Sequence, residues 1–120
     1  MEIRNITNQF VSLSADQTLL GLVVGFDTQH PYGICARIFN LGSRKIETIS
    51  LDYCRYVPKT DIIVPATVLK LFAWHKEFGQ GVVIQARRPR QTMEVQLQNP
   101  AGTVSSWLPL EDVTVLGPNP

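Results

Sequence analysis

The side chains in this sequence best suited to binding chemistry are aromatic and basic, and they fall in two short segments. The basic–aromatic set, as we call it, consists of Trp74, His75, Lys76, Phe78, Arg87, Arg88 and Arg90. We expect adjacent strands to bring its two segments together. Cations that neutralise phosphates and rings that stack on bases are typical of nucleic-acid binding, and the same surface could engage a protein. The alternative is that the arginines keep a hairpin soluble and that Trp74 belongs to the core.

Groups that could perform catalysis are few and do not cluster by spacing. The chain has two histidines, two cysteines and scattered carboxylates. Asp27, His30 and Cys54 could meet as a thiol site, but no nucleophile motif surrounds them, and solvated turn residues are the simpler interpretation. Two histidines without a shared pattern do not make a zinc site. We therefore expect no catalytic residue, no metal and no cofactor, and we expect the protein not to be an enzyme.

Composition indicates a folded protein without a strong overall charge. With 44% hydrophobic and 18% charged residues, the chain is far from the composition of disordered segments. A net charge of +1 creates no general attraction for polyanions or membranes, so any such partner would need a local patch. The first residues lack the basic start and apolar run of a secretory signal, and no apolar stretch approaches the roughly 20 residues that span a bilayer. We expect a cytoplasmic protein with no membrane partner and two reduced cysteines.

A weak internal similarity predicts two related structural units. Residues 19–38 resemble residues 67–86, 48 positions later, and both stretches have a strand, turn, strand pattern. This similarity favours a division into residues 1–60 and residues 61–120, joined by a linker at 58–61. A unit of roughly 60 residues is marginally stable alone, so we expect the two units to pack together.

Alternation of apolar and polar residues predicts short strands in both units. In the first unit these lie at 19–26, 34–39, 45–51 and 55–57, with a helical turn at 51–54. In the second unit they lie at 68–74, 81–87, 92–98, 104–108 and 113–116, with a helical turn at 109–112. Residues 1–18 fit a helix or a strand equally well.

Five short strands with a helical turn before the last resemble an SH3-like barrel, the broad group that includes Tudor and KOW modules. The resemblance is strongest at residues 79–83, 94–97 and 107–113. It implies an all-β protein of two tandem SH3-like five-stranded barrels packed together. Tudor modules hold methylated cations in aromatic cages, and by this resemblance the candidate walls are Trp74, Phe78 and Trp107. The first interpretation of Trp107 is structural, as a residue that closes a core.

Taken together, these features favour a protein that works by binding. The first hypothesis is a non-enzymatic adaptor that engages another protein through an exposed strand edge or through the groove flanked by Trp74 and Phe78. The alternative is a nucleic-acid-binding module that uses Lys76 and the three arginines of the basic–aromatic set. A small thiol enzyme is a third hypothesis. The oligomeric state is left open.

Overall fold

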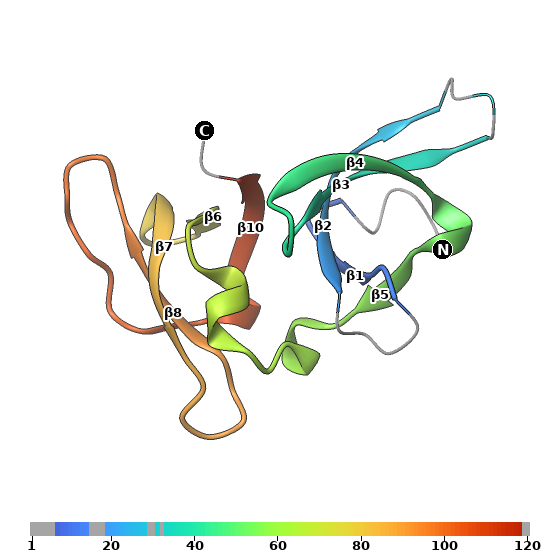
Figure 1. The fold of residues 1–120 in the computed structure, drawn as a ribbon. Helices are drawn as coiled ribbons and strands as arrows, with labels where there is room; N and C mark the ends of the chain where they lie inside the picture. The colour runs from blue at the N-terminus through green and yellow to red at the C-terminus, as the bar shows by residue number, and fades with distance from the viewer. Residues whose placement is uncertain (1–6, 15–18, 29–30, 32, 119–120) are drawn as a thin grey trace. The chain divides into compact units, whose positions relative to one another are not determined.

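The chain folds into two units, each containing one five-stranded antiparallel sheet. The computed structural model describes residues 7–14, 19–28, 31 and 33–118. In this part of the chain every strand belongs to one of the two sheets, and helical structure is limited to short 3-10 segments (Figure 1). The units span residues 1–58 and 59–120. The expected all-β architecture with two five-stranded sheets is confirmed. Within the described ranges, no helix has the length and apolar character needed to cross a bilayer.

The first sheet is built from strands β1 to β5. They are β1 (Phe10–Ser12), β2 (Leu20–Asp27), β3 (Cys35–Asn40), β4 (Lys45–Ser50) and β5 (Arg55–Val57), in the spatial order β4-β3-β2-β1-β5. A 3-10 turn, η2 (Leu51–Tyr53), precedes β5, and the Ser50 hydroxyl accepts a hydrogen bond from the Asp52 backbone N–H. One face carries the buried core cluster of Val11, Val23, Ala36, Ile38 and Cys54. We call this face the core face.

The second sheet repeats this plan with strands β6 to β10. They are β6 (Leu71–His75), β7 (Gly79–Arg87), β8 (Glu94–Gln98), β9 (Leu108–Pro109) and β10 (Val113–Pro118), in the order β10-β6-β7-β8-β9. The 3-10 turn η5 (Leu110–Asp112) precedes β10. The buried apolar residues of this sheet alternate along the strands and include Leu71, Ala73, Val83, Val95, Leu97, Val113 and Val115.

Both sheets therefore have the same connectivity: within each, the fifth strand pairs with the first, the other strands follow in chain order, and a 3-10 turn precedes the fifth strand. Equivalent positions lie 59 to 62 residues apart, as Asn40 and Asn99, Gly21 and Gly81, or Phe10 and Phe72 illustrate. The similarity at a spacing of 48 residues is wrong as a structural alignment, because it superposes β2 and β3 on β6 and β7. Central strands share an apolar pattern, so one strand is easily mistaken for the next.

The two equivalent glycines are required by close packing. A Cβ at Gly21 would lie 2.3 Å from Ile38 Cγ2, and one at Gly81 would lie 2.9 Å from the Gln98 carbonyl oxygen. Both distances are shorter than ordinary van der Waals contact, so each neighbouring strand approaches a position where only hydrogen fits. A bulge follows each glycine, at the register shifts between Val23 and Gly25 and between Val83 and Gln85.

The predicted strands at 68–74 and 104–108 differ most from the structure. Residues 65–68 form the 3-10 turn η4, which begins at Pro65, and β6 starts only at Leu71, after Lys70 with a φ of 67°. Around 105, the buried Ser105 hydroxyl accepts a hydrogen bond from the Leu97 N–H at 2.9 Å, so a side chain takes the place of one ladder hydrogen bond, while the Ser105 N–H still donates to the Leu97 carbonyl oxygen at 2.8 Å. Only an isolated bridge at Val104 and the two-residue β9 remain of that strand.

The predicted linker at 58–61 is also structured. Residues 59–61 form the 3-10 turn η3 (Lys59–Asp61), which belongs to the second unit. The Lys59 ammonium group donates a hydrogen bond to the Val113 carbonyl oxygen at the start of β10. Partial burial lowers the pKa of Lys59, while Glu111 and Asp112 on η5 act in the opposite direction. This segment is thus an anchored start of the second unit.

Candidate functional site

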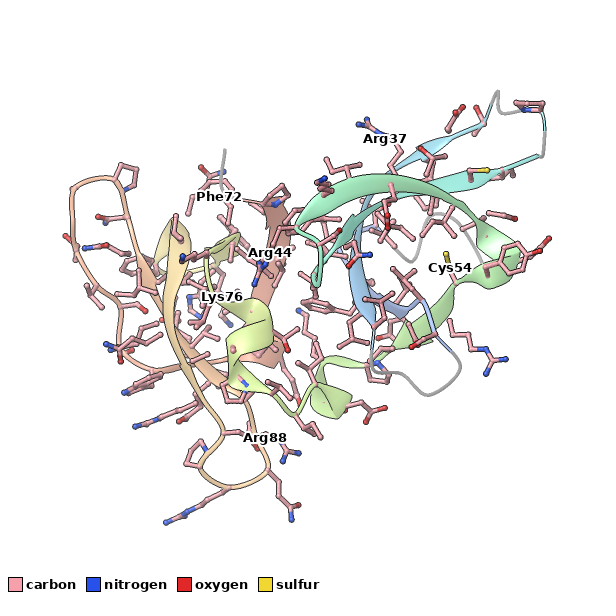
Figure 2. The ribbon with its side chains drawn as sticks, in the orientation of Figure 1. Arg37, Arg44, Cys54, Phe72, Lys76 and Arg88 are labelled. Carbon is pink, nitrogen blue, oxygen red and sulfur yellow. The ribbon has the colours of Figure 1, made fainter. Side chains whose placement is uncertain are left out.

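The structure separates the two segments of the basic–aromatic set. Trp74 and His75 end β6, and Lys76 and Phe78 lie in the β6–β7 turn, whereas Arg87 ends β7 and Arg88 and Arg90 follow it. Strand β7 has nine residues, so at about 3.3 Å per residue its ends are on the order of 25 Å apart along the strand. Figure 2 shows Lys76 and Arg88 at these opposite ends. The expected single surface is not formed, because a hairpin places its turn away from the far end of its second strand.

Trp74 faces solvent. It lies between Thr114 on β10 and Gln80 on β7, and 42% of its surface is exposed. The interpretation of Trp74 as a core residue is therefore wrong. Phe78 is half-buried in the adjacent turn. Trp74 offers an exposed ring in the second unit.

His75 serves the β6–β7 turn. Its side chain is buried, and Nδ1 accepts hydrogen bonds from the backbone N–H groups of Glu77 and Phe78 at 3.2 and 3.3 Å. An imidazole nitrogen that accepts two backbone hydrogen bonds closes a tight turn in the way an Asn or Asp side chain often does. This arrangement gives His75 a structural role.

The arginine that ends β7 is engaged within its own unit. Arg87 Nε donates to Glu94 Oε1 at 2.8 Å, and its guanidinium carbon lies 4.1 Å from the centre of the Trp107 ring. The pair spans directly opposed positions of β7 and β8. Trp107 is half-buried, and a ring face covered by a resident cation is not free to stack on a base. Because Trp107 accompanies Arg87, it also lies away from Trp74 and Phe78, so the three proposed cage walls do not meet.

The remaining cations of the set differ in exposure. Lys76 and Arg90 are exposed, and Arg88 is half-buried, with its Nε buried and without a hydrogen-bond partner among the described atoms. Lys76 at one end of β7, and Arg90 with the Glu94-paired Arg87 at the other, form no continuous basic patch.

The hypothetical thiol site has unfavourable chemistry. His30 lies outside the described residues, Asp27 ends β2, and Cys54 is buried in the core of the first unit. Burial raises the pKa of the Cys54 thiol, and the neighbouring Cys35 raises it further. A nucleophilic cysteine needs a lowered pKa and access to solvent. Among the described residues, no three His, Cys, Asp or Glu side chains lie where they could hold a metal ion.

The first sheet ends in a long open strand that the sequence pattern did not identify as an edge. Strand β4 pairs with β3 over six consecutive residues without a register shift and is the last strand of its sheet. The side chains of residues 45–48 are all exposed, and Ile46 retains 46% of its surface. No strand among the described residues pairs with the outer side of β4, and an edge of this kind presents backbone donors and acceptors to a partner strand.

The direction of these backbone groups follows from the β3–β4 ladder. The Leu51 N–H donates to the Ile34 carbonyl oxygen, and in an antiparallel ladder alternate residues direct both backbone groups to the same neighbour. By this alternation the residues bonded to β3 are Lys45, Glu47 and Ile49. The N–H and C=O groups of Ile46 and Thr48 therefore point to the open side of β4.

The other three edges in the described sheets are protected. Strand β5 has three residues and is followed by Pro58, and β9 has two residues and ends in Pro109. Strand β10 is interrupted by a register shift after Val115 and ends in Pro118. Short strands, bulges and prolines all hinder pairing with a further strand. Among these edges β4 is the one suited to accept a strand.

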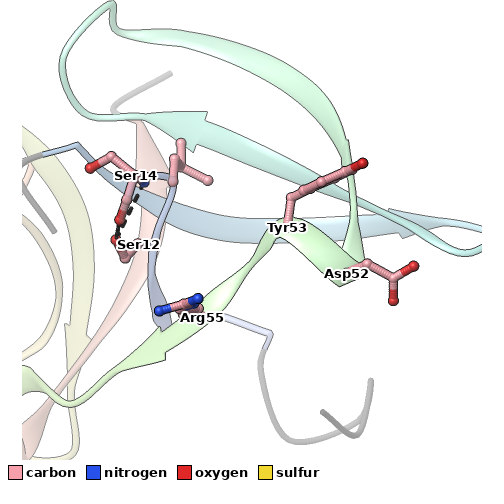
Figure 3. A pocket seen from close by; sticks show the side chains of 6 residues that line it. Ser12, Ser14, Asp52, Tyr53 and Arg55 are labelled. Atoms are coloured by element: carbon pink, nitrogen blue, oxygen red, sulfur yellow. Dashed lines mark hydrogen bonds between the residues drawn. The ribbon is translucent and has the colours of Figure 1, made fainter. Parts of the chain in front are cut away.

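A shallow cavity of about 210 Å³ also lies in the first unit. Its lining comes from β1, the residues after it, η2 and β5, and consists of Ser12, Leu13, Ser14, Asp52, Tyr53 and Arg55 (Figure 3). The Ser12 hydroxyl is committed to the Ser14 carbonyl oxygen at 2.6 Å. In Figure 3 Asp52 points away from Ser12, Ser14 and Arg55, so the polar groups of the lining do not converge on one point.

Comparisons of this chain with protein-family models, with curated proteins and with solved structures found no match. The candidate site is therefore defined by geometry alone. It consists of the open side of β4, with Ile46 and Thr48 directing backbone groups outward. The signal in the sequence was the alternation at 45–51, but alternation does not say whether a strand is central or at an edge.

Proposed function

We propose that this protein is a non-enzymatic adaptor that engages another protein by adding a strand of that partner to β4. The observation that carries the proposal is the regular, exposed edge of six residues, with the Ile46 and Thr48 backbone groups directed outward. Strand addition supplies main-chain hydrogen bonds for affinity, and side chains on alternate positions supply selectivity.

We also propose that each unit is an SH3-like barrel and that the two arose by duplication. The support is the shared strand order, in which the fifth strand pairs with the first, and the 3-10 turn before the fifth strand in both sheets. Equivalent glycines and equivalent bulges in the second strand agree with this interpretation. Many functions use this fold, so it supports a binding role without identifying the partner.

Nucleic-acid binding through the basic–aromatic set has less support. Arg87 is paired with Glu94 and covers Trp107, and the exposed cations Lys76 and Arg90 lie at opposite ends of β7. Nucleic-acid affinity needs several cations along one track and falls steeply with salt. Binding that survives a rise in salt and treatment with nuclease would favour the protein partner.

The test is a substitution that closes the β4 edge and leaves β3 pairing intact. Proline at an edge position removes an outward N–H without breaking the inner ladder, so Ile46→Pro should block strand addition. The protein, the Ile46→Pro variant and the matched Ile46→Val control are each used to capture partners from lysate with and without nuclease treatment. Partners held by edge pairing are expected with the wild type and Ile46→Val and lost with Ile46→Pro.

Circular dichroism and thermal melting verify that each variant folds. If Ile46→Pro is unfolded, Thr48→Pro replaces it, because the Thr48 N–H also points outward. Capture of the same partners by a folded proline variant would contradict the proposed site. Loss of every partner on nuclease treatment would favour the nucleic-acid alternative.

A further inference from the structure

The charges around β4 select among extended segments, and this inference rests on the proposed role of that edge. Three cations lie on β3, β4 and the turn between them, namely Arg37, Arg44 and Lys45, and all three are exposed. The same region has one carboxylate, Glu47, and its Oε2 accepts a hydrogen bond from the buried Asn40 amide at 3.0 Å. In a protein of net charge +1, this is a local positive edge.

The two faces of the edge carry different cations. Arg37 is paired with Thr48 and lies on the face opposite to the core face, as Figure 2 shows for its outward side chain. Lys45 is paired with Asn40 and lies on the core face. Strands are about 4.8 Å apart, so a strand added to β4 would lie about 10 Å from β3, and the long Arg37 side chain can extend over the small Thr48 to reach it.

We infer that β4 receives an acidic extended segment in antiparallel orientation. Let p be the partner residue opposite Thr48. Residue p+2 is then opposite Ile46, and residue p+3 is opposite Lys45. A carboxylate at p meets Arg37, an apolar side chain at p+2 covers Ile46, and a carboxylate at p+3 meets Lys45 across the other face. Residue p+1 is opposite Glu47 and must not be acidic. The segment therefore has the pattern acidic, non-acidic, apolar, acidic.

The charges of β4 and the backbone of Arg44 together argue against a second copy of this chain as the occupant. Two copies joined through β4 in antiparallel orientation would be related by a two-fold axis perpendicular to the sheet. Directly opposed side chains lie on the same face of the sheet, so this axis must pass beside one residue of β4 that pairs with the same residue of the other copy. Centring on Lys45 or Glu47 opposes like charges. Centring on Ile46 opposes Lys45 and Glu47, but it also places Thr48 opposite Arg44, whose φ of 61° and N–H bond to Asn40 keep it out of a ladder, so this register pairs only residues 45–47. Centring on Thr48 places Glu47 opposite Ile49 and gains no ion pair.

The test uses fluorescein-labelled octapeptides with blocked ends and measures fluorescence polarisation. The acidic probe is TVETVETS, in which the first Glu is p, and the neutral probe TVQTVQTS differs only at the two acidic positions. The acidic probe is expected to bind about fivefold more tightly at low salt, and the difference should shrink at about 0.5 M salt because both pairs are exposed. Equal affinity of the two probes, or no binding of the acidic probe up to about 1 mM, would overturn the inference.

Variants assign each charge. Arg37→Gln should remove the preference for Glu at p, and Lys45→Gln should remove the preference at p+3, each measured with probes carrying a single Glu. Lys70→Gln makes the same change in net charge at an exposed position of the second unit and should leave both affinities unchanged. A preference that persists in both β4-region variants, or that falls equally in Lys70→Gln, would contradict the assignment.

A backbone probe separates failure of this inference from failure of the proposed edge. An N-methyl group on the p+2 residue removes an N–H directed at β4, whereas one on p+1 removes an N–H directed away from it. The acidic probe should lose binding at least tenfold with the first change and be nearly unaffected by the second. If the two N-methyl groups differ in effect but the acidic and neutral probes bind equally, β4 accepts a strand and the preference for an acidic segment is rejected. Equal effects of the two N-methyl groups would reject the edge itself.

Discussion

The two sheets have the same connectivity but differ in their fourth strand. In the first sheet this strand is β4, six residues long, regularly paired and exposed. In the second it is β9, reduced to two residues, because the buried Ser105 side chain takes the place of a ladder hydrogen bond and Pro109 ends the strand. One position in a common plan is thus open in one unit and closed in the other. The comparison teaches that two sheets of the same connectivity can differ in whether an edge is open to a further strand, and that this difference is independent of their aromatic and basic residues.

Equivalent phenylalanines should show the largest difference between the units. Phe10 is fully buried and pairs with β2 and β5, while its counterpart Phe72 on β6 is half-buried. Phe10→Ala is expected to lower the free energy of unfolding by about 3–5 kcal/mol, and Phe72→Ala by about 1–2 kcal/mol. Denaturant unfolding followed by circular dichroism measures both. Equal losses would show that the two positions are not distinguished by burial.

The paired glycines test whether the units are equivalent at close-packed positions. Gly21→Ala and Gly81→Ala should each cost about 1–3 kcal/mol, because the new methyl group meets Ile38 in one case and the Gln98 backbone in the other. Gly25→Ala is the matched control, since no atom lies within 4 Å of the position its Cβ would take. That variant should change stability by less than about 1 kcal/mol in the same unfolding assay. If Gly81→Ala leaves the free energy of unfolding unchanged, Gly81 is not a close-packed position equivalent to Gly21.

A buried cysteine in the first unit predicts a pH dependence of stability that its equivalent in the second unit does not produce. Cys54 in the first unit corresponds to Val113 in the second, and both are buried. Because the pKa of Cys54 is raised in the folded state, the unfolded chain loses this proton first, and stability should decline as pH rises above the ordinary thiol pKa. Cys54→Val should reduce that alkaline decline and change stability at neutral pH by less than about 1 kcal/mol.

Denaturation midpoints collected from neutral to alkaline pH compare the two proteins. Parallel curves for the wild type and Cys54→Val would exclude Cys54 as the source of the decline. The substitution has a smaller expected effect than the aromatic and glycine changes, since only ionisation of a partly shielded thiol is removed.

Local features of the fold followed from the sequence, whereas its long-range features did not. The helical turns predicted at 51–54 and 109–112 are observed as η2 and η5, and the strand predicted at 45–51 from its alternation is observed as β4. The strand spacing of the internal similarity was wrong, because an apolar run does not reveal its place in a sheet. The role of His75 depends on backbone groups in its own turn and left no pattern in the sequence.

The candidate site was predictable only in outline. An exposed strand edge was expected, but its location was not. Whether a strand has a second neighbouring strand depends on the order of all strands in the sheet, which the residues of one strand do not reveal. The basic–aromatic set was taken as one surface, but antiparallel pairing of β6 with β7 separates its two segments along a nine-residue strand. Whether those residues contact a partner stays a prediction, and Trp74 is the member with the greatest aromatic exposure.

The anchored turn that opens the second unit determines where that unit can be cut for separate expression. A recombinant fragment beginning at Ile62 would lack the Lys59 side chain that holds the first residue of β10, and with it the whole of η3. A fragment that begins at Pro58 keeps the Lys59–Val113 hydrogen bond. Trypsin should therefore degrade the fragment that begins at Ile62 more readily than the one that begins at Pro58.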